Sequence, residues 1–305
     1  MSTPPFTKPK TQLTWLITGC SSGLGLSLAR LALSQGHTVI ATSRNPSSTP
    51  LLVSEVENYP HHHQNKSRWI QLDVDDRASS DIVERLEKED GIEIDVLVNN
   101  AGFSVLAPVE TASEDEVRAH MESMYFGPLR LVRAVLPHMR RRRYGVVVNF
   151  SSGAALDGRD AMGAYAGAKA GLDGITRVLA KEVAPFNIRV LTVVLGAFNT
   201  NMPSATAVGK VPLPDDYRGS ASDKMIQFLT GGSMPGPAFV MSDKDKAMKV
   251  VYEMVLGEGI GAGREAERLL PLGSDMTARV KGAQEYLGHA LGEFKDVTNS
   301  VGIDR

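Results

Sequence analysis

Cysteine is almost missing from this sequence of 305 residues, because Cys20 is its single representative. One cysteine excludes an internal disulfide framework and fits a reducing compartment, so we expect a cytoplasmic protein. The sequence around Cys20 contains nothing that would activate a thiol, and we interpret this residue as a small packing residue in a loop.

Charge of one sign and long apolar runs are also missing. The formal net charge of −2 gives no global attraction to nucleic acid or to an anionic membrane. No run approaches the roughly 18 apolar residues of a membrane-spanning helix, so we predict no membrane span. Four consecutive arginines, residues 140–143, would suit nucleic acid only with interleaved aromatic residues, and we interpret them as a solvated helix end.

A cluster with metal-ligand spacing is missing as well. The run His61–His63 stands in a polar, turn-rich segment without cysteines or grouped carboxylates around it. Consecutive histidines on a loop point in different directions and do not converge on one ion. We therefore predict no metal site.

Apolar segments that alternate with amphipathic ones indicate the fold. Residues 14–18, 37–43, 68–74, 94–98, 145–150 and 187–195 are expected strands, and residues 268–272 are a candidate for a short final one. Helices are expected at 26–35, 75–90, 113–143, 165–184 and 243–256. Continuously apolar strands that alternate with helices predict an α/β protein, a single doubly wound Rossmann-type domain with a central parallel sheet flanked by helices. We expect this domain at 12–295, between a disordered arm at 1–11 and a tail at 296–305.

The first expected strand enters a loop that is typical of dinucleotide binding. Its glycines, Gly19, Gly23 and Gly25, follow Thr18 in the pattern G-x-x-x-G-x-G and precede an apolar-periodic helix. Glycines let the backbone turn tightly and approach a pyrophosphate at the helix N-terminus. A glycine-rich loop without a ligand is the alternative.

Arg44 follows the second expected strand, where an acidic residue would bind the ribose hydroxyl of NAD. An arginine suits the additional phosphate of NADP, and the hydroxyl of Ser43 is placed to assist. A solvated loop arginine is the competing interpretation. Asp73, at the end of the third strand, is expected either to accept a hydrogen bond from an adenine amino group or to cap a helix.

The fourth expected strand ends in Asn99, which we expect to bond neighbouring strands. Asn100, Ala101 and Gly102 then fall at the crevice where open parallel sheets bind ligands.

Tyr165 and Lys169 lie one helical turn apart, so their side chains share a face. An ammonium beside a phenol lowers the phenol pKa from its usual value of about 10 and prepares it for proton transfer. Ser152, at the end of a preceding strand, is placed to bond the same substrate oxygen.

A long irregular stretch, residues 197–242, is expected to be a lid over the substrate. Thr200 lies at its start, where it would contact the cofactor. The apolar and aromatic residues of the stretch favour a sizeable apolar or aromatic substrate; they are Phe198, Met202, Tyr217, Met225, Phe228 and Met234.

Taken together, these motifs resemble the short-chain dehydrogenase/reductase family, most closely its single-domain 17β-hydroxysteroid and retinol dehydrogenase-like group, over residues 12–275. The resemblance implies that Tyr165 is the general acid/base, that Lys169 lowers its pKa and holds the nicotinamide ribose, and that Ser152 positions the substrate oxygen. It also implies a preference for NADP(H) over NAD(H). The cofactor site that it implies comprises Thr18, Gly19, Ser21, Ser22, Gly23, Leu24, Gly25, Ser43, Arg44, Asp73, Val74, Asn100, Ala101, Gly102, Tyr165, Lys169, Gly196, Phe198 and Thr200.

Two positions depart from the family pattern. Met124 stands where the family carries an asparagine that supports a water relay to the lysine, and a thioether cannot donate a hydrogen bond. A relay rebuilt through Ser123 or water, slow turnover and different chemistry all stay open. Leu195 replaces a proline before Gly196, which predicts a slight loop adjustment.

The expected function is that of an NADP(H)-dependent ketoreductase, in a setting such as secondary metabolism, which interconverts a carbonyl and a secondary alcohol. An isomerase or dehydratase on the same scaffold, and a non-catalytic NADP(H)-binding protein, are the alternatives. The expected partners are a small-molecule substrate and, by analogy with relatives that pair the helices near 113–143 and 161–184, further copies in a homodimer or homotetramer.

Overall fold

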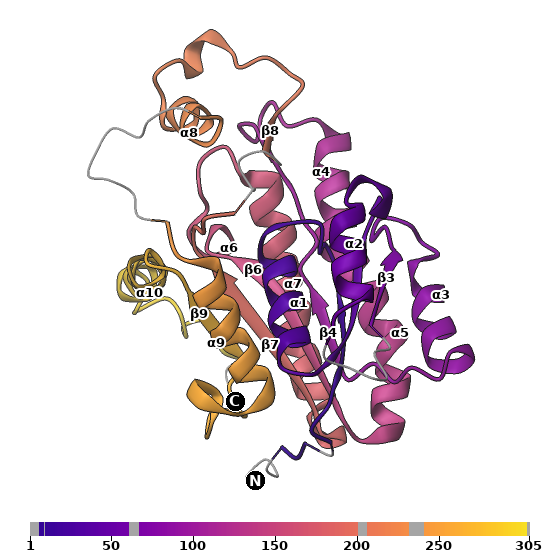
Figure 1. The fold of residues 1–305 in the computed structure, drawn as a ribbon. Helices are drawn as coiled ribbons and strands as arrows, with labels where there is room; N and C mark the ends of the chain where they lie inside the picture. Colours follow the sequence, from indigo (N-terminus) through magenta and orange to yellow (C-terminus); the bar gives the residue numbers. More distant parts are fainter. Residues whose placement is uncertain (1–5, 9, 61–66, 201–205, 232–240, 304–305) are drawn as a thin grey trace.

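Seven parallel strands form the central sheet of the computed structural model (Figure 1), which describes residues 6–8, 10–60, 67–200, 206–231 and 241–303. Their order is β3-β2-β1-β4-β6-β7-β9. The strands are β1 (Thr14–Ile17), β2 (Thr38–Ser43), β3 (Arg68–Gln71), β4 (Val96–Asn99), β6 (Gly145–Ser152), β7 (Ile188–Leu195) and β9 (Leu269–Leu272). The order reverses between β1 and β4, which places a ligand crevice at the carboxyl ends of these two strands.

Helices cover both faces of this sheet (Figure 1). One face carries α1 (Gly23–Ser34), α2 (Pro50–Glu57) and α9 (Lys244–Leu256). The other face carries α3 (Ser79–Glu84), α5 (Gly127–Arg142) and α7 (Gly163–Glu182). The predicted α/β fold with a doubly wound parallel sheet is thereby confirmed.

The two cores follow from the alternation of side chains along each strand. Trp15 and Ile17 point into the core beneath α1 and α9, whereas Leu16 points into the core beneath α3 and α5. All three side chains are fully buried. Because both faces are covered, the central strands β1, β4 and β7 are buried and largely apolar, and this is why continuous apolar runs predicted them.

Several helices differ from the expected ones. The segment 45–67, expected to be a polar loop, contains α2, and α3 begins at Ser79 instead of residue 75. The expected helix at 113–143 consists of α4 (Glu114–Met121), a π-helical segment (Glu122–Phe126) and α5. Ser113 and Glu116 form the capping box that starts α4. His61–His63 lie outside the described residues.

The stretch 197–242 is more regular than predicted. It contains β8 (Thr206–Val208), which pairs with β5 (Ser104–Leu106), and α8 (Ala221–Leu229), whose first turn is capped by Ser220. These elements lie beyond the carboxyl ends of the central strands (Figure 1). Met202 and Met234 lie outside the described residues.

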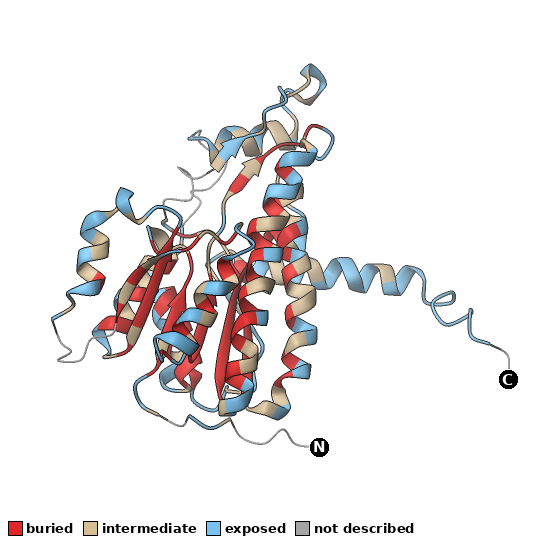
Figure 2. Cartoon of the chain, turned by 90° about the vertical axis from the view of Figure 1, so that its right-hand side faces the viewer, coloured by how far each residue is buried: buried red, intermediate tan, exposed pale blue. Residues whose placement is uncertain are grey.

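Two further helices complete the fold. The short helix α6 (Ala154–Asp157) follows β6, and α10 (Met276–Glu293) follows β9. Beyond its first turn α10 extends away from the rest of the protein, and most of its residues are exposed (Figure 2). In the described part of the chain, no helix is both long and apolar enough to cross a membrane.

Candidate active site

The loop after β1 turns sharply because two of its glycines adopt left-handed backbone angles, φ +72° at Gly19 and φ +61° at Gly23. Gly25 is needed for a different reason. A Cβ at this position would lie 2.5 Å from Nδ2 of Asn100 and 2.6 Å from the carbonyl oxygen of Gly19. Helix α1 therefore packs tightly against the loop and against the end of β4.

Thr18 and Asn100 join the ends of β1 and β4. The Thr18 hydroxyl accepts hydrogen bonds from the backbone N–H groups of Asn100 and Ala101, both at 3.0 Å. The Asn100 amide donates to the carbonyl oxygens of Thr18 at 2.8 Å and Gly19 at 3.1 Å. These hydrogen bonds fix the carboxyl ends of β1 and β4 relative to each other at the crevice. Asn99 bonds the side chain of Asn149 on β6, as expected.

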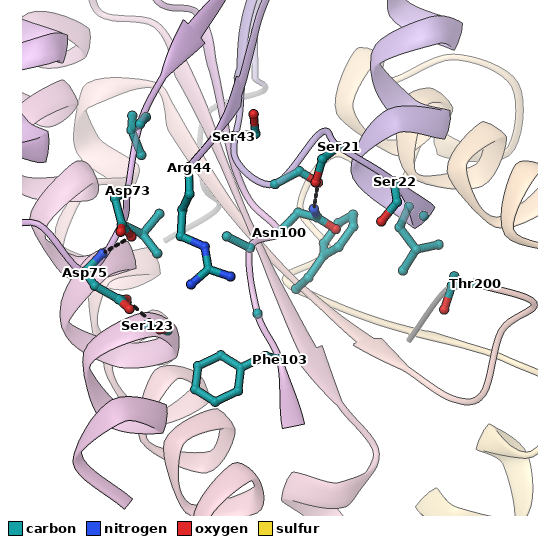
Figure 3. Close-up of a pocket in the computed structure, with 18 of the residues that line it drawn as sticks. Ser21, Ser22, Ser43, Arg44, Asp73, Asp75, Asn100, Phe103, Ser123 and Thr200 are labelled. Carbon is teal, nitrogen blue, oxygen red and sulfur yellow. Dashed lines mark hydrogen bonds between the residues drawn. The ribbon is translucent and has the colours of Figure 1, made fainter. Parts of the chain in front are cut away.

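The crevice is a cavity of about 400 Å³ (Figure 3). It brings together most of the residues predicted to bind a cofactor, namely Gly19, Ser21, Ser22, Gly23, Leu24, Ser43, Arg44, Asp73, Val74, Asn100, Ala101, Gly102, Tyr165, Lys169 and Thr200. Thr18, Gly25, Ser152, Gly196 and Phe198 do not line it. The lining residues that sequence analysis missed are Leu72, Asp75, Phe103, Ser123, Phe150, Ser151 and Leu195.

At one end of the cavity, Arg44 and Asp73 face the open space (Figure 3). Arg44 is exposed and forms no ion pair with any residue of the described ranges. The Ser43 hydroxyl accepts a hydrogen bond from the indole of Trp69 at 2.9 Å, which leaves its own proton for a ligand. Asp73 accepts one hydrogen bond from the backbone of Asp75 through Oδ1.

Tyr165 lines the same cavity and is 7% exposed. It projects from α7 toward Ser152 at the end of β6. Burial raises the pKa of Tyr165 above its usual value, while the hydrogen bond with Ser152 and the charge of Arg279 oppose this rise. Ser152 also accepts a hydrogen bond from the backbone of Ala154 at 3.2 Å, which fixes its hydroxyl.

Lys169 is 4% exposed and donates a hydrogen bond to the carbonyl oxygen of Phe150 at 2.7 Å. Burial lowers the pKa of Lys169 to about 8, against the attraction of Asp173 one turn further along α7. Its Nζ lies 5.9 Å from the centre of the Tyr165 ring. Lys169 thus turns to the strand carbonyl, and its effect on the phenol pKa stays a prediction.

Met124 is fully buried in the π-helical segment. Its sulfur lies 3.2 Å from where a Cβ on Gly102 would stand, and Nζ of Lys169 lies 3.9 Å from the same point. An apolar side chain therefore occupies the space beside the lysine. Ser123 donates its hydrogen bond to Asp75, so in this structure it builds no relay to Lys169.

The start of the predicted lid lies close to the glycine loop. Thr200 lines the cavity, and its Cβ is 3.7 Å from where a Cβ on Gly23 would stand. Phe198 is 8% exposed and forms an isolated bridge with Ser242. Gly196 follows β7 and approaches the side chain of Asp275.

Comparisons with known proteins agree with this geometry. A family profile described as short chain dehydrogenase matches residues 14–208. An oxidoreductase of Passalora fulva is 38% identical over 193 residues, which is 63% of this chain and 85% of that protein. The crystal structure of a short-chain dehydrogenase from Streptomyces avermitilis superimposes with a TM-score of 0.80 at 32% identity, covering 97% of this chain and all of the other.

A short-chain dehydrogenase from Sphingobium yanoikuyae, solved in complex with NADPH, has a TM-score of 0.69 at 21% identity. The superposition covers 96% of this chain and 99% of that protein. This likeness concerns the fold.

Proposed function

The chain belongs to the short-chain dehydrogenase family, and from this membership we propose that it is an NADP(H)-dependent oxidoreductase that interconverts a carbonyl and a secondary alcohol. One observation carries the proposal. Tyr165 and Lys169 line the same cavity as the glycine loop and Arg44.

The described residues fit a dinucleotide. The cavity follows the N-terminus of α1, where the N-cap residue Ser22 makes no side-chain capping bond, so the first-turn N–H groups are available to a pyrophosphate. Gly19 and Gly23 permit close approach of the backbone. Arg44 forms no ion pair within the described ranges, so its guanidinium is available for the phosphate of NADP. A protein with a similar fold has been solved in complex with NADPH.

In the proposed reaction the bound nicotinamide supplies or accepts the hydride. Tyr165 gives its phenolic proton to the substrate oxygen during carbonyl reduction and takes it back during alcohol oxidation. Ser152 bonds the same oxygen, while Lys169 stays fixed to the Phe150 carbonyl and presents its remaining protons to the cofactor ribose. Burial of Tyr165 and Lys169 excludes water from the reacting atoms.

For the substrate, we propose a mid-sized apolar or aromatic molecule. Phe198, Tyr217, Met225 and Phe228 come from the segment between β7 and α9, and all four are at least partly buried. Aromatic and thioether side chains in a segment that follows the carboxyl end of β7 favour apolar ligands.

The test is a fluorescence titration of NADPH and NADH against the wild type, Arg44→Ala and the control Arg118→Ala. Arg118 is an exposed arginine that pairs with Glu114 on α4, so its removal changes the net charge equally. We expect Arg44→Ala to weaken NADPH binding by roughly 10- to 100-fold and NADH binding little, because one charge-assisted phosphate contact is lost. Equal affinity of the wild type for both cofactors would contradict the assignment of Arg44.

Met124 favours a second candidate, a protein that binds NADP(H) without turnover. Its thioether fills the space beside Lys169 where the family places a relay asparagine. Such a protein would bind NADPH tightly, consume none with any ketone, and be unaffected by Tyr165→Phe. An isomerase or dehydratase would convert substrate without stoichiometric NADPH consumption, so one assay of product against NADPH separates all three functions.

For the assembly, we propose a homodimer or homotetramer formed through α5 and α7. A groove of about 420 Å³ runs between these helices, lined by apolar side chains such as Val132, Leu136 and Leu179. Val178 on its rim is 55% exposed. We expect Val178→Asp to shift the mass measured by light scattering toward the monomer, whereas an unchanged mass would contradict this interface.

A further inference from the structure

The N-terminal turn of α10 contributes a buried arginine to the neighbourhood of the active site. Arg279 donates two hydrogen bonds to the Asp157 carboxylate, from Nε at 2.6 Å and from Nη2 at 2.8 Å. It donates a third from Nη1 to Asp275 at 3.2 Å. The Arg279 side chain is only 9% exposed. We call these three residues, Asp157, Asp275 and Arg279, the α10 clamp.

One arm of the α10 clamp contacts the end of β6. The Cζ atom of Arg279 lies 2.5 Å from where a Cβ on Gly153 would stand. Gly153 directly follows Ser152, and Asp157 ends the short helix α6 that begins at Ala154. Arg279 therefore fixes the backbone on which the Ser152 hydroxyl is held, and a side chain at position 153 would displace it.

The other arm contacts the end of β7. Oδ1 of Asp275 accepts a hydrogen bond from the backbone of Ala197 at 3.2 Å and lies 1.9 Å from where a Cβ on Gly196 would stand. Ser152 and Leu195 are register partners of β6 and β7. The α10 clamp thus joins the two strand ends that frame the catalytic residues, and it accounts for a glycine at 196.

Charge gives the α10 clamp a second consequence. Burial raises the pKa of Tyr165, Arg279 lowers it and Asp173 raises it, whereas Lys169 is turned to the carbonyl of Phe150. The nearby Arg159 is partly buried, and its pKa is lowered by burial and by the charge of Arg279. The Arg279 guanidinium is itself stabilised by Asp157 and Asp275, so it keeps its charge at every working pH.

We propose that Arg279 is a positioning residue of the catalytic site, which fixes Ser152 and Gly196 through the α10 clamp and holds a permanent positive charge at the end of β6 beside Ser152. The inference rests on the proposed oxidoreductase function. It assigns to the C-terminal helix, outside the segment matched by the family profile, a part in proton transfer.

The test compares Arg279→Gln, Arg279→Lys and the control Lys281→Gln, an exposed cation on the same helix. Oxidation of α-tetralol with NADP⁺ is followed as kcat/KM against pH, because this direction needs the phenolate. For Arg279→Gln we expect the apparent pKa to rise, since an opposing charge is lost. We also expect kcat to fall roughly 10-fold through misplacement of Ser152.

Arg279→Lys should restore the wild-type apparent pKa of the kcat/KM profile but only part of kcat, because it returns the charge without the bidentate hydrogen bond to Asp157. Lys281→Gln should change neither. If Arg279→Gln lowers only the melting temperature and keeps the wild-type pH profile and kcat, the residue is structural and the proposal is wrong.

Two additions keep the result decisive. Arg279→Gln combined with Asp157→Asn removes one of the two carboxylates that the single variant leaves unpaired, and it serves as the second variant if the single one unfolds. Hydrogen exchange of the backbone at 153–157 and 196–197, measured without substrate, should quicken in the Gln variants and stay unchanged in Lys281→Gln. If the wild type does not oxidise α-tetralol, the proposed function fails for this probe. Unchanged hydrogen exchange in the Gln variants would separately show that the α10 clamp does not fix this backbone, and the proposal would then be wrong.

Discussion

Replacing Lys169 with methionine should make the folded protein more stable at neutral pH while abolishing turnover. The lysine is 4% exposed and keeps its charge in an apolar setting with one hydrogen bond, to the Phe150 carbonyl. Methionine has a similar length and no charge. A buried charge that catalysis requires lowers the free energy of unfolding. A variant without this charge regains that free energy and loses activity.

The magnitude follows from the pKa. A fall from the usual 10.5 to about 8 corresponds to a cost of ~3 kcal/mol for the charged form at pH 7. Loss of the bond to Phe150 offsets ~1 kcal/mol of this, so we expect Lys169→Met to gain ~2 kcal/mol and roughly 4 °C in Tm. Between about pH 8 and 10.5 the unfolded wild type binds more protons than the folded one, so wild-type stability rises with pH and the advantage of the variant disappears.

The assay is urea unfolding of the cofactor-free proteins from pH 7 to pH 10.5, with Lys181→Met as the control. Lys181 is an exposed lysine near the end of the same helix, and its replacement should change the free energy of unfolding by less than ~0.5 kcal/mol at every pH. A Lys169→Met variant that is no more stable at pH 7, with a difference that does not depend on pH, would refute the reasoning.

Two further predictions concern packing in the site. Gly25→Ala should lower the free energy of unfolding by ~1–3 kcal/mol and weaken NADPH binding in a fluorescence titration, because its methyl group would lie 2.6 Å from the Gly19 carbonyl oxygen. Gly282→Ala on α10, where nothing lies within 4 Å of the new methyl group, should leave binding unchanged, and equal effects of the two would contradict this account. Met124→Asn should cost ~1–3 kcal/mol for a buried amide yet raise kcat by restoring a polar group beside Lys169. Met124→Leu should alter neither the free energy of unfolding nor kcat. A fall of kcat in Met124→Asn would contradict the idea that the missing polar relay limits turnover.

The central strands were predictable because both of their faces are buried. The continuous apolar runs at 14–18 and 187–195 correspond to β1 and β7 within one residue at each end. The short apolar run at 268–272 corresponds to the edge strand β9, none of whose residues is buried. The helices α2 and α8 were missed for the opposite reason. Val56 is the only fully buried residue of α2, and α8 has none, so neither helix shows the strong apolar periodicity that reveals a core-facing helix.

The candidate site likewise has parts that the sequence predicts and parts that it does not. Residues next to the ends of strands gather as predicted, because parallel strands bring their carboxyl ends to one edge. The π-helical segment that carries Met124 was not predictable, since it depends on the packing of Gly127, where a Cβ would lie 2.7 Å from the carbonyl oxygen of Val74. The direction of Lys169 was not predictable either, because spacing along a helix does not reveal a strand carbonyl within reach.

The α10 clamp has a consequence for how the protein is made. Asp157 and Arg279 are separated by 122 residues. A ribosome therefore releases the glycine loop, Ser152, Tyr165 and Lys169 well before it releases the arginine that joins β6 to β7. Since such distant contacts form late, a nascent chain that has not yet reached α10 would have the cofactor crevice without the contacts that fix Ser152 and Gly196. Release of α10 would in this way act as a late step of active-site assembly.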